Sequence, residues 1–433
     1  MSIVKNGLSR RSWLKRSVAA IGGSAPLWFR SLAANVKADV TSPRKHKSCI
    51  LLWMGGGPSQ LDTFDMKPDA PDKFRGEFNP IATSVPGIQI CEHLPQLATM
   101  TEKLALLRNM STGEADHHRA SYYMQTGHKI LPNTNHPLLG SIASAELDRE
   151  STELPNFFWL NGPPTANAGY LGARHAPMRI GEIREQAERN LEDSKPSRGF
   201  EDFDQSLHLL RSLDDRFQSQ YHGAKALSDH RAIYQSAVRL MRSSKLSALE
   251  LSGEPRKLRE AYGEKNFGKS CLLARRLVEV GVPFVGIGMG GYDTHNDNWS
   301  LLKPLLGELD MGMSTLLRDL DSRGLLDSTL VIWMGEFGRS PQISNGNNPG
   351  RDHSAKAWTT VLAGGGLKTG QIIGDTGKNG LEVEGRPTSA GDFMATICKS
   401  MGIDFTKEYT TPEARPIAIA EAGSQPVAEL FSS

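Results

Sequence analysis

The chain has 433 residues, of which 38% are hydrophobic and 23% charged, a composition typical of a soluble globular protein with a sizeable core. Residues 1–38 hold seven of the 50 basic residues and no acidic one, so the rest, with 43 basic and 48 acidic residues, has a net charge of −5. This acidic body disfavours a dedicated nucleic-acid-binding protein. No run of about 18 apolar residues predicts a membrane span, and the four cysteines form no CxxC pair.

The first 38 residues have the order of an export signal. Residues 9–15 (SRRSWLK) resemble the twin-arginine signal, with Trp13 where Phe is usual. A modestly apolar stretch, 17–29, follows, and small residues then offer cleavage sites after Ala34 or Ala38. The alternative is a short basic amphipathic helix. We expect the twin-arginine translocase to export the chain to the periplasm or another extracytoplasmic compartment, with no transmembrane segment left in the mature chain.

In the first half, apolar runs and helical spacing predict the following elements in chain order: a strand over 47–54, helices over 93–108, 117–125 and 137–147, a strand over 157–160, irregular surface over 161–200, and helices within 201–280. The strand over 47–54 (KSCILLWM) is apolar throughout and stops at three glycines, which is typical of a fully buried strand. The helices within 201–280 are expected to form an insertion or cap.

In the second half, strands and amphipathic helices alternate: strands over 283–288, 328–334, 357–363 and 371–373, and helices over 299–323 and 389–401. Such alternation indicates an α/β fold, with a mostly parallel central sheet covered by helices on both faces. We predict that residues 39–433 form one such domain.

Chemically useful side chains lie next to three of these strands. Asp293 and His295 follow the first, Glu336 follows the second, and His353 lies in the loop before the third. Because ligands bind at the carboxyl ends of parallel strands, we expect these side chains to converge. Imidazole and carboxylate ligands suit a divalent metal, Zn²⁺ or Mn²⁺ rather than Mg²⁺ or Ca²⁺. The alternative is that each residue is only a helix cap or part of a surface pair.

Six stretches carry a resemblance to a known family: CILLWMGGGPSQLDTFDMKPDAP, DHHRASYYMQTG, HPLLGS, GGYDTHNDNW, MGEFGRSP and GRDHS. Together they resemble the domain-of-unknown-function 1501 family, which is similar to the alkaline phosphatase/sulfatase superfamily. The resemblance implies a metal-dependent α/β fold in which Asp293 and His353 hold one metal. It also implies that Glu336 replaces the aspartate of that superfamily's Asp-His-Gly motif.

The sequence also departs from the superfamily pattern. Residues 54–57 (MGGG) stand where a metal-binding aspartate usually ends the first strand, and the nearest acids are Asp62 and Asp65. Phe337 replaces the histidine of the Asp-His-Gly motif, so a second metal site is altered. None of the cysteines has the C-x-P-x-R-like context from which sulfatases make formylglycine, which disfavours that route.

The helix over 117–125 ends like the superfamily's nucleophile helix, so the resemblance places His117, His118 and Ser121 near the nucleophile position. His117 or Ser121 would then be nucleophile or acid, with His118 binding the substrate anion. A solvated polar helix face is the alternative.

Arg339 and Arg351 flank Glu336 and His353. They suit bidentate binding of phosphate or sulfate, but they could equally neutralise nearby acids. We therefore predict an exported, metal-dependent hydrolase of small phosphate or sulfate esters, with Glu336 as metal ligand or base. The alternative is a non-catalytic binding or assembly protein on the same fold.

Overall fold

In the computed structural model of the chain, residues 47–147, 153–184, 199–220 and 225–432 are described, and the expected export signal lies outside them. An eight-stranded sheet runs through these residues. From edge to edge its strands are β12 (Gln371–Ile373), β4 (Leu104–Met110), β11 (Trp358–Gly364), β8 (Thr329–Met334), β1 (Ser48–Met54), β7 (Phe284–Met289), β5 (Phe157–Leu160) and β6 (Met178–Ile180). Only β11 is antiparallel to its neighbours in this sheet, so the predicted mostly parallel sheet is confirmed.

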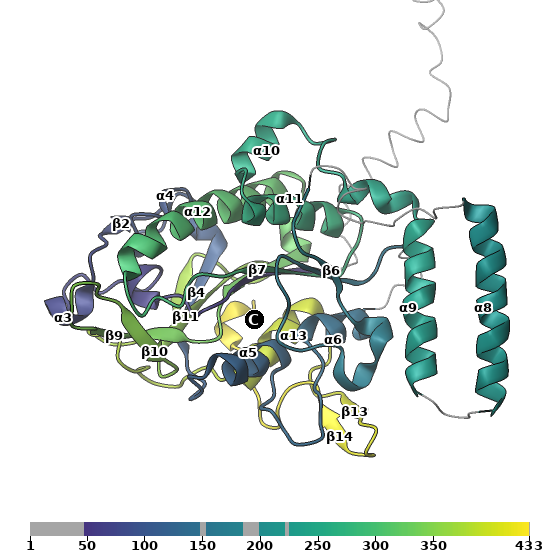
Figure 1. Cartoon of the computed structure of the whole chain (residues 1–433). Coiled ribbons are helices and arrows are strands. Elements are labelled where there is room, and N and C mark those ends of the chain that lie inside the picture. The colour runs from purple at the N-terminus through teal and green to yellow at the C-terminus, as the bar shows by residue number, and fades with distance from the viewer. Residues whose placement is uncertain (1–46, 148–152, 185–198, 221–224, 433) are drawn as a thin grey trace, which may run out of the picture. The chain divides into compact units, whose positions relative to one another are not determined.

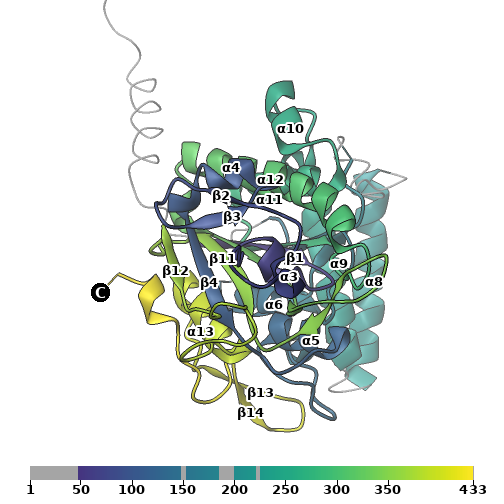
Figure 2. The same ribbon diagram turned by 90° about the vertical axis from the view of Figure 1, so that its left-hand side faces the viewer.

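Helices cover both faces of the sheet, as Figure 1 shows. They are α11 (Asn266–Glu279) and α12 (Asn298–Ser322) on one face, and α5 (His117–Thr126), α6 (Leu139–Glu146) and α13 (Ala390–Met401) on the other. The turned view in Figure 2 shows the same layers, with α11 and α12 above the strands and α13 below them. In β1 the side chains alternate between two hydrophobic clusters, with Ile50 and Leu52 in one and Leu51 and Trp53 in the other. This alternation explains why β1 is apolar throughout.

The helix predicted over 93–108 is wrong for most of its length. The segment holds a short α4 (Pro95–Ala98), a 3-10 turn η2 (Thr101–Lys103) and then strand β4. Its leucines fit a helical period, but the residues of β4 other than Arg108 are buried, and β4 lies between β12 and β11. A strand flanked on both sides is apolar on both faces, and its pattern cannot be told from a buried helix by periodicity alone.

The segment expected to be a helical insertion contains α8 (Phe200–Gln220), α9 (Lys225–Met241), η5 (Ser244–Leu249), α10 (Arg256–Tyr262) and α11. Among these, α11 packs against β7 and belongs to a covering layer of the sheet. The segment expected to be irregular surface contributes the edge strand β6, and its residues 185–198 lie outside the described ranges. By their contacts, His46–Ser433 form one compact unit.

The smaller described elements are η1 (Gln60–Asp62), α3 (Asp72–Arg75), β2 (Pro80–Ala82), β3 (Gln89–Cys91), η3 (Gly169–Leu171), η4 (Ala173–His175), η6 (Leu326–Ser328), β9 (Gly338–Ile343), β10 (Arg351–Ser354), β13 (Glu408–Thr410), β14 (Pro416–Ala418) and η7 (Ala428–Leu430). Strands β9 and β10 form an antiparallel hairpin just after β8. None of the described helices is long and apolar enough to cross a membrane.

Candidate functional site

The candidate site lies past the carboxyl ends of β7 and β8. The chain leaves β7 at Met289 and reaches Asp293 and His295 within six residues, and Glu336 follows β8 directly. The hairpin of β9 and β10 brings His353 to the same place, and α5 adds His117 from its first turn. Four separate segments therefore supply the side chains, as expected at this edge of a parallel sheet.

Two glycines allow these segments to approach closely. A Cβ on Gly350 would lie 2.2 Å from the carbonyl oxygen of His295, so only glycine fits where the start of β10 meets that loop. The Arg351 amide donates to the Thr294 carbonyl oxygen at 3.1 Å and fixes this contact. Gly56, after β1, has φ of +113°, and a Cβ there would lie 2.4 Å from the Asp293 amide nitrogen.

Three side chains form a small triangle of ligand-type atoms. The Nε2 atoms of His295 and His353 are 2.9 Å apart, and each lies 3.1 Å from Oδ1 of Asp293. With metal–ligand bonds of about 2.0–2.2 Å, two atoms bound to one ion lie roughly 3–3.5 Å apart. The triangle therefore has the size of one face of a four-coordinate metal site.

Each histidine of the site is held through its other ring nitrogen. Nδ1 of His353 lies 2.9 Å from the Ala115 carbonyl oxygen, and Nδ1 of His295 lies 2.9 Å from an oxygen of Asp352. These partners only accept hydrogen bonds, so Nδ1 donates in each case and the Nε2 of a neutral ring carries a lone pair. Metal-binding histidines are commonly fixed in this way by a backbone carbonyl or a carboxylate.

His117 is held in the same manner and extends the site. Its Nδ1 donates to Glu336 Oε1 at 2.7 Å, and its Nε2 lies 3.3 Å from Asp293 Oδ2. That Nε2 atom is buried and has no hydrogen-bond partner in the described part of the chain. The hydrogen bond with Glu336 raises the pKa of His117 despite partial burial. Ligand atoms of His117, Asp293 and His353 all lie within 4.8 Å of one another and could hold a metal ion.

Asp293 is kept ionised at the centre of the site. Burial opposes its charge, but the hydrogen bond and the positive charge of Arg339 outweigh it and hold the carboxyl pKa well below its usual value. The Arg339 guanidinium lies 2.6 Å from Asp293 Oδ1 and also donates to the carbonyl oxygens of Gly57 and Arg351. Arg339 is fully buried, so its donors serve the protein interior.

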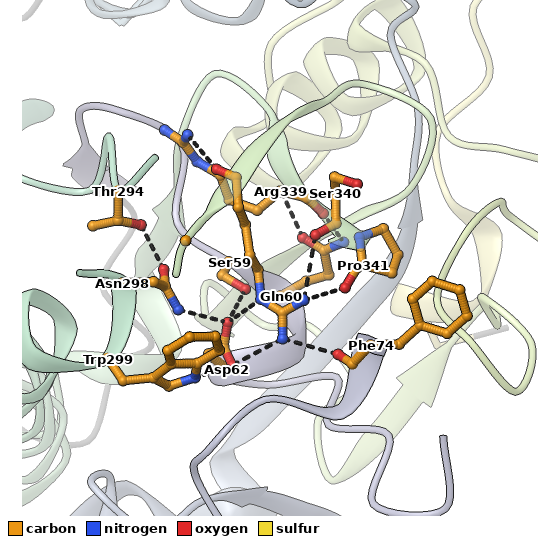
Figure 3. Close-up of polar contacts among 12 residues, drawn as sticks. Ser59, Gln60, Asp62, Phe74, Thr294, Asn298, Trp299, Arg339, Ser340 and Pro341 are labelled. Atoms are coloured by element: carbon orange, nitrogen blue, oxygen red, sulfur yellow. Dashed lines mark hydrogen bonds and ion pairs between the residues drawn. The ribbon is translucent and has the colours of Figure 1, made fainter. Parts of the chain in front are cut away.

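A second, buried cluster lies behind the hairpin and centres on Asp62 (Figure 3). Asp62 accepts hydrogen bonds from Arg351 Nε at 2.7 Å, Trp299 Nε1 at 2.9 Å and Asn298 Nδ2 at 3.1 Å. The other guanidinium donors of Arg351 reach backbone carbonyls, including that of Phe74 at 2.9 Å. Both charged side chains are almost completely buried. The geometry favours the alternative in which Arg351 neutralises an acid.

Asp62 and Asp65 are thus used elsewhere in the fold. Asp65 is buried beside Lys67 at 3.0 Å and Arg108 at 3.2 Å. Neither acid belongs to the group of side chains that could hold a metal. The ring of Phe337 lies 4.5 Å from that of His353.

The remaining candidates on α5 differ in position. Ser121 lies one turn beyond His117 and is buried, while His118 is exposed. Among the described residues, no hydrogen bond or ion pair joins either side chain to the site. Glu336 is buried and reaches His117 and the Gly56 amide, at 2.9 Å, through Oε1. Its Oε2 has no hydrogen-bond partner among the described residues.

Sequence reasoning missed two partners of the histidines, the Asp352 carboxylate and the Ala115 carbonyl oxygen. Asp352 could have been found, because it directly precedes His353 and a carboxylate near paired histidines is a common support for a metal site. The Ala115 carbonyl carries no side-chain signal, since any residue at that position offers the same oxygen.

Comparisons with known proteins identify a family. A family model described as "Protein of unknown function (DUF1501)" matches residues 46–431. No match was found among curated proteins.

Solved structures of similar shape include a sulfatase, PsFucS1, from Pseudoalteromonas sp. (13% identity, TM-score 0.39, covering 88% of this chain and 72% of that one). They also include the alkaline phosphatase from the Antarctic bacterium TAB5 (12%, 0.38, covering 84% and 100%). The lipoteichoic acid synthase LtaP from Listeria monocytogenes is a third (8%, 0.37, covering 83% and 72%). These likenesses are too distant to carry an argument about chemistry.

Proposed function

The chain belongs to the DUF1501 family of proteins of unknown function, and we propose that it is an exported, metal-dependent hydrolase of phosphate or sulfate esters. One observation carries the proposal. Three histidines, each held through Nδ1, direct Nε2 toward the single carboxylate of Asp293. Neutral imidazoles held this way bring lone pairs together, which is unfavourable unless a cation or a proton lies between them.

The residues present fit a divalent metal ion. His295, His353 and Asp293 would be its ligands, and the 2.9–3.1 Å spacing of their ligand atoms suits one ion. The Nε2 of His117 lies 3.3 Å from the other carboxylate oxygen, Oδ2, and is left free to carry a proton. Two imidazoles with a carboxylate favour Zn²⁺ or Mn²⁺ over Mg²⁺ or Ca²⁺. When bound, such an ion polarises an ester oxygen and makes water a better nucleophile.

The chain's own groups then have distinct tasks. Asp293, kept anionic by Arg339, supplies the negative charge of the ligand set. His117 carries or accepts a proton at Nε2, and Glu336 stabilises its imidazolium form through the 2.7 Å hydrogen bond. Ser121 is a candidate nucleophile and His118 a candidate contact for the substrate anion. Substitutions of the two residues test these roles.

Metal content and turnover test this function together. The purified full chain is analysed for bound metals and assayed with generic aryl phosphate and aryl sulfate esters. Bound zinc or manganese with turnover that a chelator abolishes is the expected result. A preparation that takes up no added metal and hydrolyses neither ester would contradict the proposal.

One observation favours the alternative, a non-catalytic binding or assembly protein. The two arginines expected to clamp a substrate anion, Arg339 and Arg351, are buried and engaged within the protein. Arg339 also shares Asp293 Oδ1 with any bound ion. Metal binding without hydrolysis of either ester would select this alternative.

Export rests on residues 9–38 and is tested separately. Replacing Arg10 and Arg11 with Lys should leave the unprocessed precursor inside the cell, because twin-arginine transport depends on both arginines. Cell fractionation and N-terminal sequencing of the variant measure its location and processing. Normal processing and export of this variant would contradict the assignment of residues 9–38 as a twin-arginine signal.

A further inference from the structure

A large cleft opens beside the candidate metal group. It has a volume of about 910 Å³ and shares His353 with that group. Residues of the β9–β10 hairpin, including Ser340, Pro341 and His353, and residues within 376–384 line it. Ligand pockets usually range from about 300 to 1,000 Å³, so this cleft is far larger than a single phosphate or sulfate group needs.

The metal group itself is partly exposed to solvent, and its His353 lines the cleft. The side chains of Asp293 and His295 are 47% and 41% exposed, and that of His353 is 22% exposed. An ester group attached to a long molecule can therefore reach the site while the rest of that molecule lies in the cleft.

The cations that face the cleft are lysines. Arg339 and Arg351 are fully buried, and their donors are engaged within the protein. Lys356 and Lys378 line the cleft. Lys378, in the segment 376–384, is exposed. Lys356 lies 2.8 Å from Glu382, in an ion pair whose two side chains are 70% and 69% exposed.

An exposed ion pair of this kind contributes little to stability. A bound anion can therefore replace Glu382 as the partner of Lys356 at small cost. The lining acids Glu382 and Glu384 would repel an anion. The lysines and the acids therefore have opposite effects on anion affinity, and single substitutions can separate these effects.

The cleft lacks the surface that single-stranded nucleic acids use. His353 carries the only aromatic ring among its lining residues, all of which lie in the described part of the chain. Proteins that bind single strands stack successive bases on aromatic side chains. The lining combines apolar side chains, Leu381 and Val383, with the two lysines, which suits an oligomer that carries anionic groups without stacking bases.

We propose that this cleft binds the non-reacting part of an oligomeric ester that carries further sulfate or phosphate groups, and that Lys378 recognises one of those groups. The proposal rests on the proposed hydrolase function, since it treats the cleft as an extension of the substrate site. It changes the expected substrate from a small ester to a long polyanionic one.

Binding of defined polyanions to the full chain tests this inference. The probes are dextran sulfate, inorganic polyphosphate of similar chain length, and neutral dextran, each titrated with zinc present. Dextran sulfate or polyphosphate should bind and neutral dextran should not, and the tighter of the two identifies sulfate or phosphate as the preferred group. Binding should weaken as salt rises, because exposed charges are screened.

Three variants assign the binding to the cleft. Lys378→Gln should weaken binding about two- to five-fold, the range expected for one exposed charge pair, and Glu382→Gln should tighten it by a similar factor. The matched control is Lys257→Gln, which removes an exposed lysine on α10, far along the chain from the cleft residues, and should change nothing.

Two results would overturn the inference: equal binding of neutral dextran, or equal effects of Lys378→Gln and Lys257→Gln. Release of sulfate or phosphate from the polyanion and hydrolysis of a small aryl ester are both measured on the wild-type chain in parallel. Turnover of either one without a lysine effect removes only the cleft proposal. A lysine effect on polyanion binding with turnover of neither supports the cleft as a binding site and removes the hydrolase function.

Discussion

The β10 strand contributes to two clusters that differ in almost every physical respect. The ion-pair cluster (Asp62, Arg351, Asn298 and Trp299) is buried, and the ion pair of Asp62 with Arg351 is reinforced by hydrogen bonds from neighbouring side chains. The histidine cluster (His117, Asp293, His295 and His353) is partly exposed, and its ring nitrogens face one another. Residues 351 and 353, two positions apart, belong one to each cluster.

The difference separates a cluster whose charges are satisfied within the protein from the cluster that we propose as a ligand site. In the ion-pair cluster positive donors meet negative acceptors, so the charges are neutralised without any added group. In the histidine cluster, the outer nitrogens are held and the inner ones have only each other and one carboxylate. Polar groups that the fold positions but does not satisfy are the reason for proposing a ligand at the histidine cluster.

Breaking the ion-pair cluster should give the largest effect. Arg351→Ala leaves the buried Asp62 carboxylate without its charged partner, and we expect a loss of about 3–5 kcal/mol in the free energy of unfolding, measured in urea. The control is Arg75→Ala, which removes an exposed pair with Asp72 at 2.8 Å and should cost less than about 1 kcal/mol. Similar losses of unfolding free energy for the two variants would mean that burial does not make the Arg351 ion pair more important for stability than the exposed Arg75 ion pair.

Removing a histidine of the other cluster should affect metal binding before stability. His353→Ala deletes one of three converging ligand atoms, and we expect metal affinity to fall by more than about 100-fold while the chain stays folded. Metal content after dialysis and circular dichroism check both parts. The control is His118→Ala, which removes an exposed histidine at the start of α5 and should leave metal binding unchanged. Unchanged metal content in His353→Ala would remove His353 from the ligand set.

Asp352 tests whether the support of a ligand matters. Its carboxylate accepts the Nδ1–H of His295 at 2.9 Å, so Asp352→Ala should let that ring rotate and weaken metal affinity by about 10–100-fold. Asp352→Asn keeps an acceptor oxygen and should lose less. Competition with a chromogenic chelator measures both constants. Equal affinities for wild type and Asp352→Ala would show that the ring needs no such support.

His136 is a buried histidine outside both clusters, and it can be compared with the histidines of the histidine cluster. The Tyr122 hydroxyl accepts from the His136 amide at 2.8 Å and shares a hydrogen bond with His136 Nδ1 at 2.9 Å. The Nε2 atom of His136 is buried and has no hydrogen-bond partner among the described residues. Within the described ranges no carboxylate lies beside it as Asp293 lies beside the histidine cluster, and His136 is not in the group of side chains that could hold a metal.

Burial, reinforced by the stacked ring of His128, lowers the pKa of His136 to about 4. Because the unfolded chain binds this proton near pH 6.5, stability should fall as the pH drops from 6.5 toward 4. We expect His136 to account for about 1–2 kcal/mol between pH 7 and pH 5. Urea unfolding of wild type and His136→Phe at pH 7 and pH 5 measures how much of the pH dependence of stability comes from His136. An equal pH dependence of the two chains would contradict it.

The fold was predictable where the sequence has a clear period. The strand over 328–334 and the helix over 299–323 lie within a residue of β8 and α12, because an apolar run and an amphipathic stripe each leave a distinct pattern. Strand β4 was missed, since its burial on both faces removes the alternation that marks a strand. That burial depends on strands from distant parts of the chain.

The sequence predicted which side chains of the site come together, but it did not predict what each of them contacts there. Residues that follow strand ends were expected to converge, and the structure places Asp293 and His353 3.1 Å apart. The partner of Arg351 was not predictable, because Asp62 lies 289 positions earlier in the chain. Nothing local to GRDHS distinguishes an arginine that binds a carboxylate in the core from one that faces a substrate.

The position of Arg351 has a practical consequence for identifying the metal. Its buried ion pair fastens the strand that carries His353, so folding and metal binding draw on different contacts. A metal-free chain should therefore fold and melt cooperatively, and each added ion should raise the melting temperature according to its own affinity and concentration. A melting series across zinc, manganese, magnesium and calcium then ranks the ions by mass action, with no substrate required.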